Sequence, residues 1–454
     1  MKYSNTETTA SEDAGTQTAS PASWYALSVL FIAYTFSFID RTIVSLLVEP
    51  LKADLNLSDT EVSLLHGFAF AIFYTLLGIP IARLADNYSR KRIIAIGVAA
   101  WSLATCLCGL AGRFWHLFLA RVGVGVGEAA LSPAAYSMIC DLFPRQMLGR
   151  ALGIYSMGVY IGAGLAFLIG GYLIGIAFTA DTVQLPLVGS LKPWQLVFIV
   201  VGAPGLLVAV LVMTLREPKR LGGGPAAGLP LAAVFSLVKR ERGTFLNHFM
   251  GFAALGLLFN AFLAWAPSLL IRQMGYTTAE AGLQIGIAIM VFGSLGIVAG
   301  GWHTDRLTRR QVPDAPIRTG LLAGCWLLPV GIAMPLVATP GLKAILLALF
   351  FFWSAFPYAA AAAAMQMAAP PQLRAQASAL YLFCLNFIGI GMGATLVALL
   401  TDGVFGDESA LPYSMAITCL ISAPLGIYFL FACKTPFRAS LAARQREMPK
   451  GALL

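Results

Sequence analysis

The dominant feature of this sequence is a series of long apolar segments separated by short polar loops. A helix that crosses a bilayer needs about 20 predominantly apolar residues. Twelve segments meet this rule: 24–48, 61–82, 93–112, 115–140, 150–176, 194–215, 244–270, 280–302, 317–339, 342–366, 374–401 and 411–433. The sequence therefore predicts an all-α membrane protein with twelve transmembrane helices.

The composition excludes most other classes of protein. Only 11% of the residues are charged, whereas a soluble globular protein carries about 25%. This deficit argues against a water-soluble enzyme and a disordered regulator. The 30 basic residues form short clusters rather than one basic face, so no nucleic-acid partner is expected. The cysteines lie in apolar segments without a C-x-x-C pair, and the chain has no H-E-x-x-H motif and no nucleophile elbow. We therefore expect no disulfide, no metal site, no enzymatic activity and no bound cofactor.

The distribution of Lys and Arg predicts the orientation, because these residues are enriched in cytoplasmic loops. With both termini inside, most of the 30 basic residues fall on the cytoplasmic side. The outer loops hold only Lys52, Arg113, Lys192, Arg272 and Lys343, and two more, Arg41 and Arg121, lie within spanning segments. The absence of organelle signals and of long outer loops favours a bacterial inner membrane.

A linker and an internal repeat predict two six-helix halves. The stretch 216–243 is rich in Gly, Pro and charge, which is typical of a linker. Residues 82–92 and 301–310 each place a basic cluster four residues after an Asp, as expected for duplicated halves. Such halves are typical of secondary transporters that bind substrate at their interface. The expected division is a disordered cytoplasmic tail, a six-helix bundle, a cytoplasmic linker, a second bundle and a cytoplasmic tail, at 1–23, 24–215, 216–243, 244–433 and 434–454.

Four charged residues lie deep within the predicted spans, namely Asp40 and Arg41 in the first, and Arg121 and Glu128 in the fourth. A charge near the bilayer centre costs at least about 2.5–3.5 kcal/mol on insertion scales, so these residues indicate function. Asp40 and Arg121 lie about 12 Å and about 9 Å below the outer ends of their segments, so they can meet if the two helices are neighbours. Glu128 shares the helix face of Arg121, roughly 10 Å deeper.

This stack of Asp, Arg and Glu fits proton coupling. Burial favours the protonated form of a carboxyl group, and a neighbouring Arg favours the ionised form. A conformational change that exchanges water for Arg would load and release a proton, which makes Asp40 and Glu128 the candidate proton sites. The alternative is a static ion-pair cluster that holds the helices together. Arg41 points about 100° away from Asp40 on the helix, so it either receives a substrate anion or pairs with another helix.

The second half has no charge in the middle of its spanning segments. We interpret His248, near a cytoplasmic end, as a hydrogen-bonded structural residue. Most aromatic residues of the run 350–358 are expected to pack between helices or to face lipid. A charged wall in one half opposite an apolar wall in the other fits an amphipathic substrate. The residues expected to line the cavity are Tyr34, Ser37, Asn260, Trp353, Tyr358 and Asn386.

The loop after the second segment carries a family signature. It reads A-R-L-A-D-N-Y-S-R-K-R over 82–92 and resembles the major facilitator superfamily pattern G-x-x-x-D-[RK]-x-G-[RK]-[RK]. Ala82, Asn87 and Ser89 replace the first Gly, one basic residue and the second Gly of that pattern. The resemblance implies a monomer and a gating role for this loop, which latches the halves on the cytoplasmic side. The implied latch residues are Asp86, Arg90, Lys91 and Arg92, with Asp305, Arg306, Arg309 and Arg310 in the repeat.

Within that superfamily the chain resembles the spinster-like transporters. The resemblance rests on F-I-D-R around Asp40 and Arg41, on G-V-G-E-A at 125–129 and on A-L-S-P-A-A-Y at 130–136. Eukaryotic members move sphingosine phosphate and lysophospholipids. The resemblance therefore implies proton-linked transport of a lysolipid- or sphingolipid-like anion, with Asp40 and Glu128 as the proton sites. The protein would be surrounded by membrane lipids as its other partners. Organic-anion symporters of the superfamily carry similar motifs, so a proton symporter for a small organic acid is the alternative.

The fifth segment is rich in glycine, which leaves the transport direction open. Its glycines partly match an antiporter pattern, but Leu165 stands where that pattern has Pro. The alternative is close helix packing through small residues. A receptor or scaffold that transports nothing would have no need of paired intramembrane carboxylates.

Overall fold

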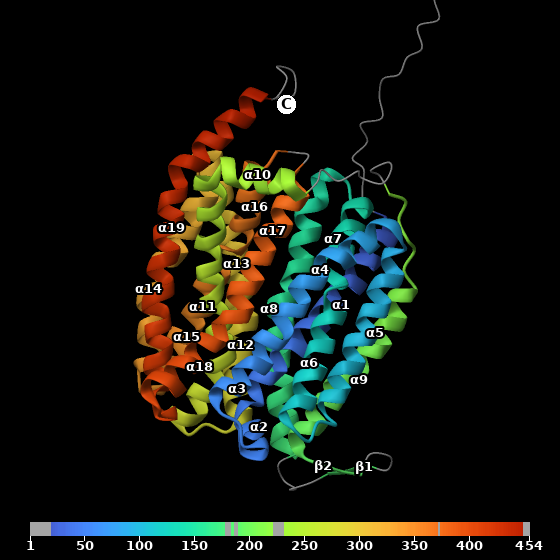
Figure 1. Cartoon of the computed structure of the whole chain (residues 1–454), viewed down its shortest axis with the longest axis vertical. Helices are drawn as coiled ribbons and strands as arrows, with labels where there is room; N and C mark the ends of the chain where they lie inside the picture. Colours follow the sequence, from blue (N-terminus) through green and yellow to red (C-terminus); the bar gives the residue numbers. More distant parts are fainter. Residues whose placement is uncertain (1–19, 178–182, 186–188, 221–230, 371–372, 448–454) are drawn as a thin grey trace, which may run out of the picture.

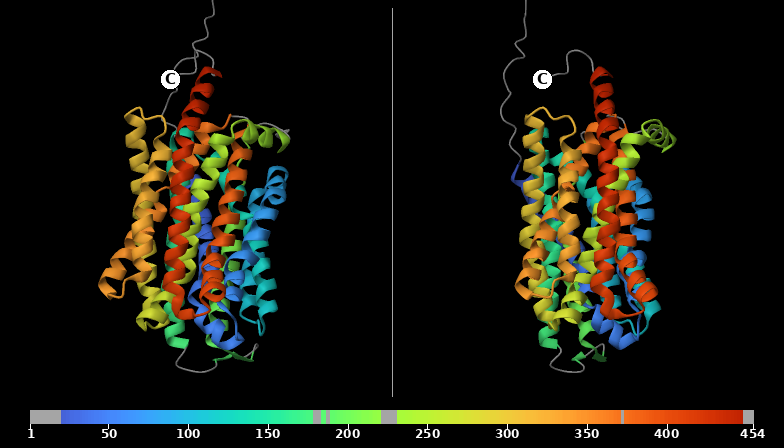
Figure 2. Two further views of the ribbon diagram at one scale, coloured as in Figure 1. Left: turned by 60° about the vertical axis from the view of Figure 1, so that its left-hand side comes forward. Right: turned by 90° about the vertical axis from the view of Figure 1, so that its left-hand side faces the viewer.

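The computed structural model describes residues 20–177, 183–185, 189–220, 231–370 and 373–447. Long helices run side by side along one axis, and a small β-hairpin lies at one end (Figures 1 and 2). Twelve helical segments within the described ranges are long and apolar enough to cross a membrane. They overlap the twelve predicted segments, so the all-α membrane fold with twelve spans is confirmed.

The first half consists of spans 1 to 6 together with a short helix and a β-hairpin. Strand β1 pairs antiparallel with β2, with Val183 opposite Leu191. In chain order its elements are α1 (Pro21–Leu46), α2 (Val48–Leu55), α3 (Asp59–Ser63), η1 (Leu64–Phe68), α4 (Ala69–Asn87), α5 (Arg90–Cys108), α6 (Phe114–Glu128), α7 (Leu131–Leu142), α8 (Arg145–Ala177), β1 (Val183–Leu185), β2 (Gly189–Leu191) and α9 (Pro193–Met213).

The second half consists of spans 7 to 12, and the helix α10 precedes it. In chain order its elements are α10 (Leu231–Arg240), α11 (Arg242–Met274), α12 (Thr278–Ile287), η2 (Ala288–Gly293), α13 (Ser294–Arg309), α14 (Ala315–Leu336), α15 (Pro340–Ala355), α16 (Tyr358–Ala368), α17 (Arg374–Asn386), η4 (Phe387–Gly391), α18 (Met392–Leu399), η5 (Leu400–Phe405), η6 (Glu408–Ala410) and α19 (Leu411–Glu447). We call the end of the bundle with α2 and the hairpin the outer end, and the end with α10 the cytoplasmic end, following the predicted orientation (Figure 1).

Matching local structure at the starts of spans 2 and 8 supports the duplication of the two halves. Ser58 and Glu61 form a reciprocal capping box at the start of α3, and Thr277 and Glu280 form the same box at the start of α12. Two residues before each box, the preceding helix ends in a left-handed residue, Asn56 with φ 53° and Gly275 with φ 68°. Asn and Gly are the residues that adopt this conformation at least cost.

Glycines let the central helices pack backbone to backbone. A Cβ on Gly162 of α8 would lie 2.4 Å from the carbonyl oxygen of Thr35 in α1. A Cβ on Gly164 would lie 2.9 Å from the carbonyl oxygen of Gly286 in α12, which belongs to the other half. The halves also touch at π-helical turns, because a Cβ on Gly67 in η1 would lie 2.6 Å from the carbonyl oxygen of Ile390 in η4. The glycines at 162 and 164 therefore serve close packing, the second interpretation offered by the sequence.

Two segments predicted as linker and tail contain helix. Within 216–243 the structure has α10, and α11 already begins at Arg242. In the predicted tail 434–454, α19 continues to Glu447. Within this part of the helix, Arg438 pairs with Asp314 and Arg444 pairs with Glu241. The rest of the predicted tails and linker, at 1–19, 221–230 and 448–454, lies outside the described residues.

We expect Gly162→Val to destabilise the protein by about 1–3 kcal/mol, because overpacking forces α1 and α8 apart. Thermal unfolding of the purified protein in detergent measures the effect. The matched control is Gly153→Ala in the same helix, where an added Cβ meets no atom within 4 Å. Equal unfolding temperatures for the two variants would contradict this account of the packing.

Candidate functional site

The charged residues of the first half gather where α1 approaches α6. Nη2 of Arg41 lies 2.6 Å from Oε2 of Glu128, and the Ser37 hydroxyl donates to the same oxygen at 2.6 Å. All three side chains are buried. The Arg41 guanidinium also lies 4.3 Å from the ring centroid of Phe70 and 5.1 Å from that of Tyr74. Water screens such an enclosed pair poorly, so its charges interact more strongly than those of a surface pair.

Arg121 lies at the depth of Asp40 but does not bind its carboxylate. The Arg121 guanidinium donates to the backbone carbonyl oxygens of Asp40 at 3.1 Å and of Leu65 at 3.4 Å. Among the described residues, neither carboxylate oxygen of Asp40 has a hydrogen-bond partner, and both are buried. They lie towards the buried Trp101 indole N–H and Thr105 hydroxyl of α5, which are close to the carboxylate but outside good hydrogen-bond geometry.

This arrangement differs from the predicted stack of Asp40, Arg121 and Glu128. The structure pairs Glu128 with Arg41 instead, which is the pairing interpretation that the sequence left open for Arg41. The glycines of α6 provide the physical reason. Cβ atoms at 125 and 127 would lie 2.6 Å from backbone atoms of α4 and α5, so α6 packs directly on these helices. This packing fixes the rotation of α6, and Arg121 and Glu128 reach different groups of α1.

Tyrosines connect the first half to the second near this site. The rings of Tyr34 and Tyr155 stack, with centroids 4.4 Å apart, and Tyr136 packs edge-on against Tyr155 at 5.3 Å. Across the interface, the centroids of Tyr160 and Tyr358 are 6.4 Å apart. The sequence identified only Tyr34 and Tyr358. Membrane tyrosines concentrate at the two water interfaces, so tyrosines in the middle of a span are the signal that would have found the other three.

The structure separates the remaining predicted cavity residues. Trp353 stacks on Trp326 of α14, with ring centroids 5.5 Å apart, and so packs within the second half. Asn260 donates to a carbonyl oxygen of its own helix at 2.9 Å, and Asn386 is half-buried at the end of α17. His248 Nε2 lies 2.9 Å from a backbone carbonyl oxygen of α16, which agrees with a structural role.

Two residues of the predicted latch bind the first half and the start of the connector. Arg90 is 1% exposed, and it lies 2.8 Å from a Glu217 oxygen and 2.5 Å from an Asp141 oxygen. The Lys91 ammonium donates to the Leu215 carbonyl oxygen at 2.9 Å. These contacts hold the connector against the loop between α4 and α5.

The other predicted latch residues are mainly exposed. The Arg306 guanidinium lies 5.2 Å from the ring centroid of Trp302. The Asp86 side chain lies outside the described set. The exposed residues are Arg92, Asp305, Arg306, Arg309 and Arg310.

An outer ion network, which the sequence analysis missed, joins the two halves at the outer end. It consists of Glu49 and Lys52 of α2, Asp59 of α3, Arg272 of α11 and Glu408 of η6. Both Nη atoms of Arg272 bind the Asp59 carboxylate, at 2.7 and 2.8 Å, and its Nε binds Glu49 at 2.9 Å. Lys52 contacts Asp59 and also Glu408, the latter at 2.6 Å. Since Asp59 is fully buried, this bidentate pair is one of the strong charge contacts between the halves.

The chemistry available at the site is that of protons and anions. It offers a buried guanidinium with a carboxylate bound to it, and a second buried carboxyl group whose backbone carbonyl accepts from Arg121. Within the described residues no three His, Cys, Asp or Glu side chains group as a metal site requires.

Comparison with known proteins identifies the group to which this chain is similar. Residues 30–394 match the family model described as Major Facilitator Superfamily. The chain is 29% identical to an MFS-type efflux pump of Mycolicibacterium smegmatis, over 88% of this chain and 89% of that protein. It is 25% identical to a probable L-galactonate transporter of Escherichia coli, over 65% and 64% of the two chains. A crystal structure of a bacterial homologue of the human lysosomal transporter Spinster, inward-facing and unoccupied, matches with TM-score 0.74 and 28% identity, over 96% of this chain and all of that one.

Glu217 provides a pH-dependent test of the cytoplasmic contacts. Burial raises the pKa of its carboxyl, but hydrogen bonds from Arg90, the Lys91 backbone and Ser89 outweigh this and hold the pKa below its usual value of 4.5. A lowered folded-state pKa means that the ionised group stabilises the fold at neutral pH, and that this stabilisation is lost as the pH falls through the folded-state pKa. We therefore expect Glu217→Gln to lower the unfolding temperature at about pH 7, and the difference from wild type to shrink below about pH 4.5. A difference that is constant with pH would contradict this.

The outer ion network predicts the effect of Arg272→Gln. Removing one partner leaves the buried Asp59 with less compensation, which costs about 3–5 kcal/mol in a buried pair and favours separation of the halves at the outer end. Ser268, one turn before Arg272 on the same helix face and fully buried, reports this opening when it is replaced by Cys in a background without native cysteines. A membrane-impermeant maleimide should label it faster in the Arg272→Gln variant. Arg113→Gln, at an exposed arginine of the outer end, should leave the labelling rate unchanged.

Proposed function

Because the chain belongs to the Major Facilitator Superfamily, we propose that it is a proton-coupled secondary transporter that moves an amphipathic anion of lysolipid or sphingolipid type. Transport occurs by alternating access between the two halves, with the cargo bound at their interface. The protein acts as a monomer in a bacterial inner membrane with both termini in the cytoplasm. The two most directly supporting facts are the family match and the similarity to a spinster homologue along the whole chain.

The Arg41–Glu128 pair is the observation that carries the proposal. Its two groups are buried and bound to each other at 2.6 Å, so neither can leave alone without a large electrostatic cost. Protonation of Glu128 neutralises the carboxylate and frees the guanidinium. A cargo anion then replaces Glu128 on Arg41, and the proton and the anion are bound together or exchanged for each other.

Asp40 is the second proton site. Both of its carboxylate oxygens are buried, so gain or loss of a proton there changes a charge inside the bundle. The Trp101 indole N–H and the Thr105 hydroxyl next to it are donors that can receive the ionised form once the proton leaves. These two donors, both in the first half, would therefore stabilise the Asp40 carboxylate after it releases its proton.

The second half supports an amphipathic cargo. A small cavity of about 40 Å³ lies between α11, α16 and α17, and apolar and aromatic side chains surround it. Tyr358 lines this cavity and packs near Tyr160 of the first half, so the cavity borders the interface between the halves. A cargo with an anionic head and an apolar tail would have a charged contact in the first half and an apolar contact in the second. Similarity to the probable L-galactonate transporter supports the alternative, a proton symporter for a small organic acid.

We expect substrate-triggered proton flux in proteoliposomes loaded with a pH-sensitive dye. The panel consists of short-chain lysophospholipids, sphingosine phosphate and small sugar acids. Asp40→Asn should reduce the proton flux more than tenfold, because the amide binds no proton, and Glu128→Gln should do the same. Asp407→Asn, at an exposed carboxylate between η5 and η6, should leave the flux unchanged.

The outcomes separate the two cargo classes and the structural alternative. Flux with lysolipids supports the proposal, whereas flux with sugar acids alone replaces it by the organic-acid symporter. Size-exclusion chromatography and thermal unfolding show whether each variant is folded. Full proton flux in a folded Asp40→Asn or Glu128→Gln variant would remove that residue from the coupling mechanism.

A further inference from the structure

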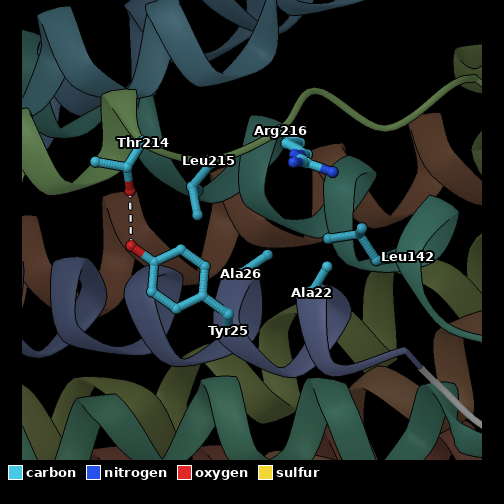
Figure 3. A pocket seen from close by; sticks show the side chains of 7 residues that line it. All are labelled: Ala22, Tyr25, Ala26, Leu142, Thr214, Leu215 and Arg216. Carbon is cyan, nitrogen blue, oxygen red and sulfur yellow. Dashed lines mark hydrogen bonds between the residues drawn. The ribbon is translucent and has the colours of Figure 1, made fainter.

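A second pocket lies at the cytoplasmic end of the first half, far from the charged site. Its volume is about 160 Å³, well above the roughly 10–15 Å³ that one water needs, so it can hold a phosphate group. One wall is the first turn of α1 and the other is the chain that follows α9 (Figure 3). The lining residues are Ala22, Tyr25, Ala26, Leu142, Thr214, Leu215 and Arg216.

The polar groups of this pocket lie together at one side. The hydroxyls of Tyr25 and Thr214 are 2.7 Å apart and form a hydrogen bond across the pocket (Figure 3). The Thr214 hydroxyl donates its own proton to the Leu211 carbonyl oxygen at 2.7 Å, so Tyr25 is the donor to Thr214. An anion in the pocket can take over the Tyr25 O–H, while Thr214 keeps its bond to the backbone. The Arg216 guanidinium lies above the apolar floor formed by the two alanines (Figure 3). A guanidinium and one hydroxyl that can be redirected, beside an apolar floor, match a phosphate ester joined to an acyl glycerol.

The charge balance around the pocket is positive. Within the described part of the chain no carboxylate forms an ion pair with Arg216, and its neighbour Glu217 is bound by Arg90 at 2.8 Å. The Lys91 ammonium lies on the other side of Leu215, whose carbonyl oxygen it contacts at 2.9 Å. An anion in this pocket therefore meets the Arg216 guanidinium, while the neighbouring carboxylate of Glu217 is already bound by Arg90.

An exposed apolar stripe on α9 leads away from the pocket. Leu207 and Val210 lie seven and four residues before Thr214, on the same helix face, and are 74% and 66% exposed. In a membrane this stripe faces the acyl chains of the leaflet. The stripe supplies apolar contact over two turns, and the pocket supplies the site for a charged headgroup at its end.

We propose that this pocket binds the headgroup of an anionic phospholipid of the cytoplasmic leaflet, such as phosphatidylglycerol. The phosphate lies between Arg216 and the Tyr25 hydroxyl, which turns from Thr214 to donate to it, and one acyl chain follows Leu207 and Val210. The lipid bridges α1, which carries the charged site, and the start of the connector between the halves. Basic side chains at a cytoplasmic membrane surface attract anionic lipids with about 1 kcal/mol each, which is about a fivefold change in affinity.

The test is the unfolding temperature of the full-length protein in detergent as short-chain phosphatidylglycerol is added. Phosphatidylcholine with the same chains and inorganic phosphate form the two comparison series. Wild type should be stabilised at lower concentrations of phosphatidylglycerol than of phosphatidylcholine, and inorganic phosphate should have little effect. Arg216→Gln should raise the phosphatidylglycerol concentration required about fivefold. Lys219→Gln, which removes an exposed cation outside the pocket at the same end, should respond as wild type does.

A second variant keeps the test open if Arg216→Gln folds poorly. Tyr25→Phe removes the hydroxyl that would donate to the phosphate, at nearly the same volume, and should weaken the response to phosphatidylglycerol without changing that to phosphatidylcholine. Equal responses to the two lipids, or an unchanged response in both variants, would overturn the proposal. Stabilisation by inorganic phosphate alone would also overturn it, since the site would then bind a free anion rather than a lipid.

Discussion

The ion pair between Arg41 and Glu128 is the interaction on which the interior of the first half depends. A guanidinium inside a bilayer-spanning bundle needs a counter-charge or backbone oxygens as acceptors, because transfer of an isolated charge from water is far more costly than any single packing contact. Ser37 and the rings of Phe70 and Tyr74 complete the shell around the pair. The close approach of α6 to α4 and α5, which glycines permit, holds Glu128 at the rotation that brings it within reach of Arg41.

The twelve spans could be predicted because hydrophobicity along a sequence is a local property. A stretch of about 20 apolar residues has almost no other stable conformation available in a membrane. The segments that prediction described incompletely are the ones whose structure depends on distant contacts. The charged residues after Cys433 look like a solvated tail, yet α19 continues through them because Arg438 and Arg444 meet Asp314 and Glu241, far away in the sequence.

At the charged site, too, the local sequence predicts one property, and contacts between distant residues decide another. The rise of a helix per residue places Asp40 and Arg121 at one depth, and the structure brings the Arg121 guanidinium to the Asp40 backbone. The choice of partner depends on how far each helix is rotated about its axis, which is set by packing between helices and cannot be read from depth. Arg272 shows the same limit at the outer end, since nothing in its own segment indicates that Asp59 is its partner.

The contact of Gly164 with Gly286 has a mechanical consequence. Two helix backbones that touch without intervening side chains cannot move closer, but they can tilt against each other. Such a point acts as a fulcrum, and the parts of the two halves on either side of it act as the arms of a lever. In the proposed alternating-access cycle, separation at one end of the bundle then accompanies approach at the other, so a single tilt changes both ends. The ionic contacts at the outer end are then balanced against contacts that form at the cytoplasmic end.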